Sequence, residues 1–515
     1  TTPDLSTTDL TALQLISVAS PTPTAADNAE SALLISVIGA LPSTAVDTSG
    51  ELQDLATTVT ALIVSSTSTT PASLSVQDLS ALGLIGVNST NLSAVLNAIA
   101  SANLASIDAV ADLQAIVNNA LAAQAAALTT LVGYADSNTG TAPAESVYAT
   151  AGVTGLQGNA TLLAAVNTAL ASTTITGTLV DSTAEVQTIV DAFAAILAEA
   201  NGSSADATGT DPSVATYQAV GVSLGTIATN AHGLSLLNDL VGERSTSDVD
   251  SVSDLNALAD AVNRLLVVAA GGTPAPALTA TELNSLLGIS TVTPENLASV
   301  LQALAGTTDN GSGINSLASL QAVVASGVTA YDAALDVIGN YALNNGGTVP
   351  DLATYTTAGV TGLRLSNGTT DSVLLAAVNS ALASTPVDNT DVSTTAAVQA
   401  VVDAYALVLA EANGALSDAT VNDPAQSVYE TLGVTLGSIS NTLNFGVNGL
   451  ALYNDVIGGM SAVQVDTIAE LDAIASVVSR LLQTAAGQTP TPALTAAELA
   501  LIGVTGVTTD NMAAV

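Results

Sequence analysis

Apolar residues recur with a helical period along most of the chain. The spacing is i, i+3, i+4, i+7 and i+8, as at Leu113, Ile116, Val117, Ala120 and Leu121, and it describes one buried face of an α-helix. The high Thr and Val content also suits β-strands. Because the period is 3.6 rather than 2, we expect an all-α fold.

Polar residues mark where these helices start. A Ser or Thr followed three residues later by Glu or Asp forms a capping box, in which hydroxyl and carboxylate satisfy free backbone N–H groups. Such pairs open the longest helices, at Thr48–Glu51, Ser182–Glu185, Ser251–Asp254 and Thr467–Glu470. Shorter helices are predicted near 78–84, 91–100 and 162–171, which gives about three helices in each stretch of chain.

One helix start occurs seven times, 61 to 78 residues apart. It pairs an aliphatic residue with an amide or acid: Leu52-Gln53, Leu113-Gln114, Val186-Gln187, Leu255-Asn256, Leu320-Gln321, Val398-Gln399 and Leu471-Asp472. Five residues before each aliphatic is a polar residue that always follows Val or Ile: Asp47, Asp108, Asp181, Asp250, Asn315, Ser393 and Asp466. The chain is therefore predicted to be a tandem array of three-helix repeat units of about 70 residues.

Longer copies group these units in threes. Residues 151–156 return at 358–363 and residues 273–279 at 489–495, offsets of 207 and 216, so the long period is about 210 residues. The expected units are 1–71, 72–146, 147–211, 212–275, 276–349, 350–423 and 424–491, with a partial unit at 492–515. Residues 511–515 match 91–95, where the repeat continues, so we expect the array to run on past Val515.

Each predicted unit opens with one of two markers. One is a Leu-rich capping box, as in 5–10, 74–79, 278–283 and 494–499. The other is a tyrosine followed by Gly-Val: Tyr148, Tyr217, Tyr355 and Tyr429. We expect these tyrosines to anchor the core, with stacking on a ligand as the alternative.

The charge balance limits the partners. Forty-four acidic residues face four basic ones, Arg244, Arg264, Arg364 and Arg480, for a net charge of −40. Nucleic-acid binding and attraction to anionic membranes both need clustered cations. We therefore expect no nucleic acid as partner, and cations or further copies of the chain instead. A second interpretation is that the charge only keeps an apolar array in solution.

Few residues or motifs in the chain point to catalysis or metal binding. The chain has no cysteine and one histidine, which excludes disulfides and clustered zinc ligands. The Ala-rich stretch 121–131 contains Gln124, Thr129 and Thr130, so no membrane-inserted helix is predicted. No P-loop, Rossmann or nucleophile-elbow motif is present. We expect a protein that is not an enzyme and that needs no organic cofactor.

Calcium is the one metal to consider. The recurring aspartates supply hard oxygen ligands between predicted helices, and the candidates are Asp47, Asp108, Asp181, Asp250 and Asp466. No Asp-x-Asp-x-Asp-Gly loop accompanies them. The alternative is that they are helix-start residues, favoured there by the helix macrodipole.

Two segments resemble a known class of proteins. Residues 494–515, which open Leu-Thr-Ala-Ala-Glu-Leu, and residues 465–474 are similar to helical repeats of giant bacterial cell-surface proteins, the repetitive adhesins and surface-layer-like proteins of Gram-negative bacteria. The resemblance implies secretion, by a one-step type I route, to the cell surface. It implies a structural subunit that self-associates into a surface layer or extracellular filament. A spacer or stalk of a giant adhesin is the alternative.

Overall fold

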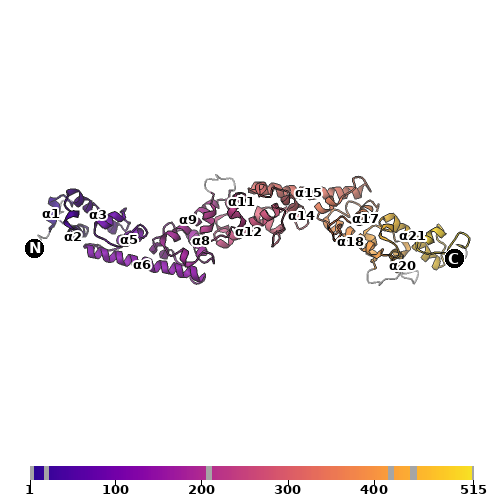
Figure 1. Ribbon diagram of the computed structural model, residues 1–515, viewed down its shortest axis with the longest axis horizontal. Helices are drawn as coiled ribbons and strands as arrows, with labels where there is room; N and C mark the ends of the chain where they lie inside the picture. Colours follow the sequence, from indigo (N-terminus) through magenta and orange to yellow (C-terminus); the bar gives the residue numbers. More distant parts are fainter. Residues whose placement is uncertain (1–4, 17–21, 204–210, 416–422, 441–448, 513–515) are drawn as a thin grey trace. The chain divides into compact units, whose positions relative to one another are not determined.

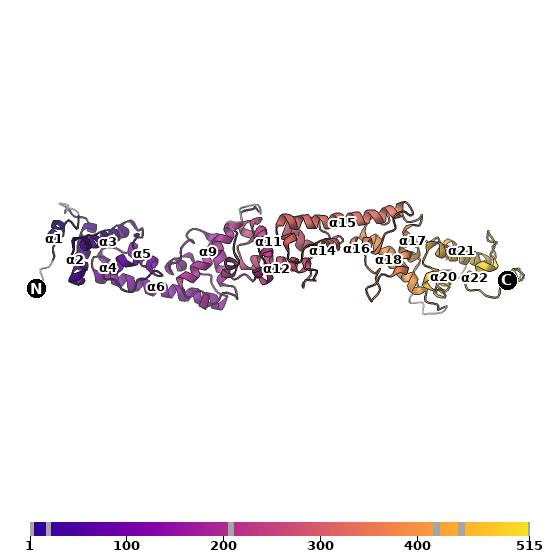
Figure 2. The same cartoon turned by 45° about the horizontal axis from the view of Figure 1, so that its top comes forward.

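The computed structural model describes residues 5–16, 22–203, 211–415, 423–440 and 449–512, and in this part the fold is all-helical (Figures 1 and 2). The described residues form no β-strand, only two isolated bridges, Arg364–Thr370 and Asn413–Ser461. The helical prediction is confirmed and the β-rich alternative is wrong. The reason is that the Thr- and Val-containing segments bury one helical face, which outweighs their strand propensity.

The helices fall into three length classes. Short helices of six to eight residues are α1 (Thr7–Ala12), α4 (Val76–Ala81), α7 (Glu145–Thr150), α10 (Val214–Ala219), α13 (Ala280–Leu287), α16 (Leu352–Thr357), α19 (Gln426–Thr431) and α22 (Ala496–Leu501). Helices of nine to 16 residues are α2 (Ala25–Ala40), α5 (Leu92–Ala100), α8 (Ala160–Leu170), α11 (Ala231–Gly242), α14 (Leu297–Ala305), α17 (Ser372–Leu382) and α20 (Gly449–Gly458). The longest are α3 (Ser49–Ser68), α6 (Val110–Ser137), α9 (Thr183–Glu199), α12 (Val252–Ala269), α15 (Leu317–Leu343), α18 (Thr395–Glu411) and α21 (Ile468–Ala485).

Short 3-10 turns complete the chain. They are η1 (Ser43–Ala45), η2 (Leu104–Ser106), η3 (Gly177–Leu179), η4 (Gly225–Thr229), η5 (Thr246–Asp248), η6 (Ser312–Ile314), η7 (Gly437–Ser440) and η8 (Ala462–Gln464). Most of them stand directly before a long helix.

The chain divides into two compact halves, Thr1–Asn263 and Arg264–Val515. In the first half, one hydrophobic cluster runs from Leu10 to Ala120 and takes in residues of α1 to α6. In the second half, another runs from Ala334 to Ile502. Leu, Val, Ile and Ala make up most of each cluster. Within each half, helices that are distant in sequence therefore bury their apolar faces together.

Three of the four predicted capping boxes form completely, and at the fourth Ser251 Oγ accepts from the N–H of Asp254 at 3.2 Å. Thr48 accepts from the backbone N–H of Glu51, and the Glu51 carboxylate accepts from the N–H of Thr48 at 3.0 Å. The pairs at Ser182 and Thr467 do the same. Because such caps involve residues three apart, local sequence is enough to place these helix starts.

The Val or Ile before most of the long helices is an anchor in the core. Ile107, Val180, Val249 and Val465 are fully buried, with φ between −136° and −142°. With ψ between 17° and 22°, the backbone here is neither helical nor extended, and the residue ends the 3-10 turn. Burial of the anchor fixes the point at which the following long helix begins.

The amide in the recurring helix start holds the loop after a short helix. Gln187 Oε1 accepts from the N–H of Thr154 at 2.8 Å, and its Nε2 donates back to the carbonyl of the same residue at 3.3 Å. Gln399 pairs with Thr361 in the same way. The glutamine side chain thus satisfies both the backbone N–H and the carbonyl of one exposed residue, as a neighbouring β-strand would. This explains why an amide or acid recurs at this position.

Two long helices each contact two neighbouring helix groups. In the first half, α6 packs against α5 near its start and against α7 and η3 further along (Figure 1). In the second half, α15 packs against α14 and then against α16 (Figure 2). A continuous helix shared in this way ties the helices before it to those after it.

Candidate functional site

A buried tyrosine–asparagine pair recurs four times in the described part of the chain. Each hydroxyl donates to an asparagine Oδ1 at 2.7 or 2.8 Å, and each asparagine Nδ2 donates to a proline carbonyl at 3.0 to 3.2 Å. The sets are Tyr148–Asn167–Pro143, Tyr217–Asn238–Pro212, Tyr355–Asn379–Pro350 and Tyr429–Asn454–Pro424. Burial raises the pKa of all four tyrosines. They are core anchors, as predicted, and their faces are not open to a ligand.

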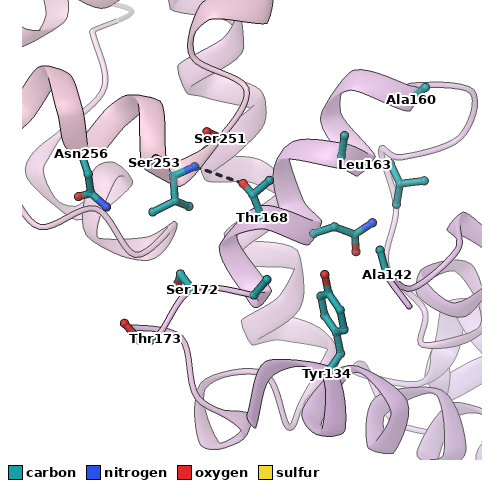
Figure 3. A pocket seen from close by; sticks show the side chains of 14 residues that line it. Tyr134, Ala142, Ala160, Leu163, Thr168, Ser172, Thr173, Ser251, Ser253 and Asn256 are labelled. Atoms are coloured by element: carbon teal, nitrogen blue, oxygen red, sulfur yellow. Dashed lines mark hydrogen bonds between the residues drawn. The ribbon is translucent and has the colours of Figure 1, made fainter. Parts of the chain in front are cut away.

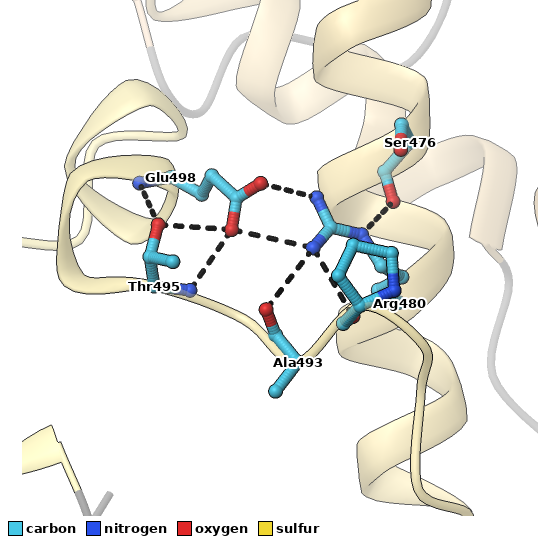
Figure 4. Close-up of polar contacts among 6 residues, drawn as sticks. Ser476, Arg480, Ala493, Thr495 and Glu498 are labelled. Carbon is cyan, nitrogen blue, oxygen red and sulfur yellow. Dashed lines mark hydrogen bonds and ion pairs between the residues drawn. The ribbon is translucent and has the colours of Figure 1, made fainter.

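An arginine–glutamate pair connects α21 to α22 (Figure 4). Arg480 is only 8% exposed, and its guanidinium donates to both carboxylate oxygens of Glu498, at 2.6 and 3.3 Å. It also donates to the carbonyls of Pro492 and Ala493. The Arg480 guanidinium, helped by Thr495, lowers the pKa of Glu498 to about 2. This bidentate geometry is the strong form of an ion pair.

The same contact occurs between α12 and α13. Arg264 donates to Glu282 at 3.1 Å, and Arg264 lowers the pKa of that carboxyl. Both glutamates also complete the capping box of a short helix. Two of the four cations in the chain therefore hold the start of the next short helix against a long one.

A hydroxyl from a middle helix caps a long helix in three places. Val252 N–H donates to Thr168 Oγ1 at 3.2 Å, Val110 N–H to Ser36 Oγ at 3.0 Å and Ile468 N–H to Ser380 Oγ at 3.0 Å. The partners are 74 to 88 residues apart. Each bond satisfies a free N–H in the first turn of a helix and connects two helix groups.

A cavity of about 860 Å³ lies beside one of these caps, between the end of α6, α8 and the start of α12 (Figure 3). Tyr134, Leu163, Thr168 and Ser251 are among its lining residues. Its walls are alanine, leucine, valine, hydroxyl and amide groups, and no Asp, Glu, His, Lys or Arg lines it. Among the side chains that commonly act as general acid or base, only Tyr134 lines this cavity.

The five candidate calcium ligands stand apart from one another. Each lies two residues before the first residue of a long helix: Asp47, Asp108, Asp181, Asp250 and Asp466 before α3, α6, α9, α12 and α21. In the described part of the chain, no group of three or more His, Cys, Asp or Glu residues is positioned to hold a metal ion. The calcium assignment stays a prediction.

Two of these aspartates have an acidic neighbour. The pKa of Asp181 is raised by a hydrogen bond with Glu185 and by the negative charge of that glutamate. Burial, together with the charge of Glu470, raises the pKa of Asp466. In both pairs the glutamate is the capping-box residue, and the aspartate lies beside it.

Sequence reasoning missed the partners in most of these contacts. It identified the tyrosines and the capping-box glutamates, but not Asn167 and Arg480, which bind them. It also missed Thr168, whose hydroxyl accepts from the N–H of Val252. It also missed Glu199 and Glu411, which are 3% and 2% exposed at the ends of α9 and α18. The repeated sequence Ala-Glu-Ala-Asn-Gly around both was the available signal.

By length and composition alone, α6 and α15 are also apolar enough to cross a membrane. Core helices of proteins that stay in water pass the same test, and one face of each helix is buried against other helices. Comparison of the chain with protein-family models, curated proteins and solved structures finds no match. Function is therefore argued from the contacts between helix groups.

Proposed function

We propose that this chain is a structural extracellular protein, a subunit of a surface layer or extracellular filament built from helical repeats. It is not an enzyme in this proposal, and the contacts between helix groups are its functional elements. The observation that carries the proposal is the recurrence of one buried Tyr–Asn–Pro contact in four of the proposed units. An enzyme concentrates unusual groups at one site, whereas a structural array repeats the same contact along its length.

The organisation we propose is seven three-helix units with the boundaries given above, followed by the start of an eighth in 492–515. Each unit consists of a short, a middle and a long helix, and the units are grouped in threes. Two arginine–glutamate pairs support the grouping, because Arg264 and Arg480 are 216 residues apart and so are Glu282 and Glu498. Two long shared helices support it as well, because α6 and α15 begin 207 residues apart.

The proposed partner is a further copy of the same chain, and the proposed location is the cell surface or the extracellular space. A chain without cysteine needs no oxidative step to fold there. Calcium bound at the recurring aspartates stays a secondary part of the proposal. No nucleic acid and no membrane insertion are included.

Electron microscopy of the purified chain in high-salt buffer tests the proposal. Salt is needed because it screens the repulsion between copies that each carry −40. Fibres or ordered sheets are expected. Isolated particles at every salt and protein concentration would rule out the layer and filament.

A stalk of a giant adhesin is the second candidate. The observation that favours it is the shared helix, since α6 and α15 each hold two helix groups in a fixed relation, as a spacer requires. A stalk stays monomeric, so sedimentation velocity separates the two candidates. A single monomeric species that shows no salt dependence supports the stalk.

A further inference from the structure

One buried amide in the middle of α6 binds backbone on both sides of that helix's midpoint. Gln124 is 7% exposed, and its Nε2 donates to the carbonyl of Thr90 at 3.2 Å, to the carbonyl of Ala151 at 3.1 Å and to Thr183 Oγ1 at 3.0 Å. Thr90 lies two residues before α5, whereas Ala151 ends α7 and Thr183 is the first residue of α9. One side chain thus connects the helices packed along the first part of α6 with those packed further along.

The threonine of this contact closes it into a small network. Thr183 Oγ1 donates to the carbonyl of Ala151 at 2.6 Å, so this carbonyl accepts from both side chains. A carbonyl at the end of a helix has no partner within the helix, and here the partners come from α6 and α9. Gly152 follows with φ +85°, and a Cβ on it would lie 3.3 Å from Gln124 Nε2. The glycine after α7 therefore lets the turn approach the amide closely.

The same place on α15 has a different side chain with the same partners. Tyr331 corresponds to Gln124 at the offset of 207, and its hydroxyl shares a 2.9 Å hydrogen bond with Thr395 Oγ1. Thr395, the first residue of α18, donates in turn to the carbonyl of Ala358 at the end of α16, at 2.6 Å. An amide and a phenol at one position therefore reach an equivalent threonine and an equivalent carbonyl.

Apolar packing leaves a gap beside the first of these networks. A cavity of about 450 Å³ lies between α5, α6 and α7, and Ala98, Ala123 and Thr150 are among its lining residues. Atoms that line a void have no contacts across it, so the void itself does not resist a change of angle between α5 and α7. The polar network is therefore needed to hold these helices in one relation.

We infer that Gln124 and Tyr331 are positioning residues that lock two joints of the chain, the points on α6 and α15 where one group of helices gives way to the next. Each lock prevents bending between the helix groups on either side, within its own half of the chain. The inference goes beyond the proposed function, because it concerns the internal stiffness of one chain and holds whether or not copies assemble. No charged side chain donates or accepts in either network, so salt should not release the locks.

Spin labels across the α6 joint test the lock, since the chain has no cysteine of its own. Ser93→Cys on α5 and Ala195→Cys on α9 place two nitroxides at exposed positions of the full chain, and double electron–electron resonance gives the distances between them. We expect one narrow distribution in the parent, unchanged by salt. Gln124→Met keeps the length of the side chain but removes its three hydrogen bonds. It should broaden the distribution at least about twofold, because a released hinge samples further angles.

The same helix provides the matched control. The amide of Gln114 bonds to the N–H and the carbonyl of Ile85, at 2.9 and 3.1 Å, and both groups lie before α5. Gln114→Met therefore removes hydrogen bonds on one side of the joint only and should leave the distribution narrow. Thr183→Val should broaden it, whereas Thr183→Ser keeps the hydroxyl and should not. Thr183→Val also carries the test if circular dichroism shows that Gln124→Met does not fold.

The second half of the chain gives an independent measurement. Gln302→Cys on α14 and Ala406→Cys on α18 are exposed label positions on either side of the α15 joint. Tyr331→Phe removes only the hydroxyl, so it should broaden this distribution, but less than Gln124→Met broadens the first. No broadening in Tyr331→Phe overturns the inference for α15.

Three results overturn the lock at α6. The first is a narrow distribution in both Gln124→Met and Thr183→Val, because the continuous backbone of α6 would then hold the joint by itself. The second is a broad distribution in the parent, which would make the joint a hinge. The third is equal broadening by Gln124→Met and Gln114→Met, which would assign the effect to a general loss of stability. Assembly is not measured in these experiments, so each of these results leaves the proposed function to its own test.

Discussion

The hydroxyl of Tyr148 donates a 2.7 Å hydrogen bond to Oδ1 of Asn167 in the interior of the first half of the chain. Tyr148 is fully buried and Asn167 is 9% exposed, so water does not replace either partner readily. Asn167 in turn donates to the carbonyl of Pro143, just before α7. One side chain of α8 thus fixes both the tyrosine and the start of the short helix that carries it.

Removing the hydroxyl of Tyr148 should lower the stability of the fold, although only one oxygen atom is lost. Tyr148→Phe leaves the buried Asn167 Oδ1 without its donor, and an unsatisfied buried acceptor costs about 1–3 kcal/mol. Urea denaturation followed by circular dichroism, with hydrogen exchange of 145–170, should show this loss. Tyr134→Phe is the control, since Tyr134 is half-buried and lines an open cavity. Equal effects of both substitutions would contradict the assigned role.

Replacing either of two glycines on α15 by alanine should change the stability of the fold, but in opposite directions. A Cβ on Gly327 would lie 2.6 Å from Cα of Val300 and 3.1 Å from the carbonyl of Ser299, so α14 must move away. We expect Gly327→Ala to destabilise by about 1–3 kcal/mol. A Cβ on Gly339 meets only Asn389, at an ordinary 3.6 Å. Gly339→Ala should therefore stabilise the helix by about 0.5–1 kcal/mol.

Thermal melts of the two variants check this pair. Hydrogen exchange in 297–305 should increase in Gly327→Ala and stay unchanged in Gly339→Ala. If Gly327→Ala leaves the thermal stability unchanged, α14 and α15 do not approach as closely as the structure describes.

Local sequence predicted the helix starts well, because a capping box joins residues three apart. The sequence showed that Val or Ile recurs before these helices, and the burial of Ile107, Val180, Val249 and Val465 explains this recurrence. It could not predict that Thr168 caps Val252, 84 residues away, or that Arg480 joins Glu498, because such partners are chosen by packing. Thr129 and Thr130 interrupt the apolar run of 121–131 but not the helix, because their hydroxyls bond back to carbonyls four residues earlier.

Asp466 should be a source of instability at neutral pH. Its pKa in the folded chain is raised, so the carboxyl supports folding fully below its unfolded pKa near 3.8, and this support is lost as the pH rises through the folded value. We expect Asp466→Asn to raise Tm at pH 7 by about 1–2 °C and to have less effect at pH 3. Asp108→Asn is the control, because Ala109, the N-cap residue of α6, makes no side-chain cap.

The same variants test calcium. If Asp466 binds Ca²⁺, millimolar Ca²⁺ should raise the Tm of the unaltered chain, and Asp466→Asn should abolish that rise. A rise in Tm for Asp466→Asn in chelator, with no response to Ca²⁺ in either protein, assigns the aspartate to the helix start.

The ion pair between Arg480 and Glu498 should make the docking of α22 sensitive to acid. The folded pKa of Glu498 is lowered to about 2, against a usual value of 4.5. A lowered pKa means that the carboxylate stabilises the fold fully above about 4.5, and that this contribution is lost as the pH falls from there through 2. Protection of amides in 494–504, corrected for intrinsic exchange rates, should decline over this interval.

Glu498→Gln should remove that dependence. It keeps the volume of the side chain but leaves the Arg480 guanidinium, 8% exposed, without its anion, so exchange in 494–504 at pH 7 should be about tenfold faster than in the parent chain. Between pH 4.5 and 2 the variant should then change little. Glu430→Gln on the exposed face of α19 removes the same charge as a control and should leave 494–504 unaltered. If Glu498→Gln keeps the parent's acid response, the pH dependence arises from other carboxylates and the pair contributes little to holding α22 against α21.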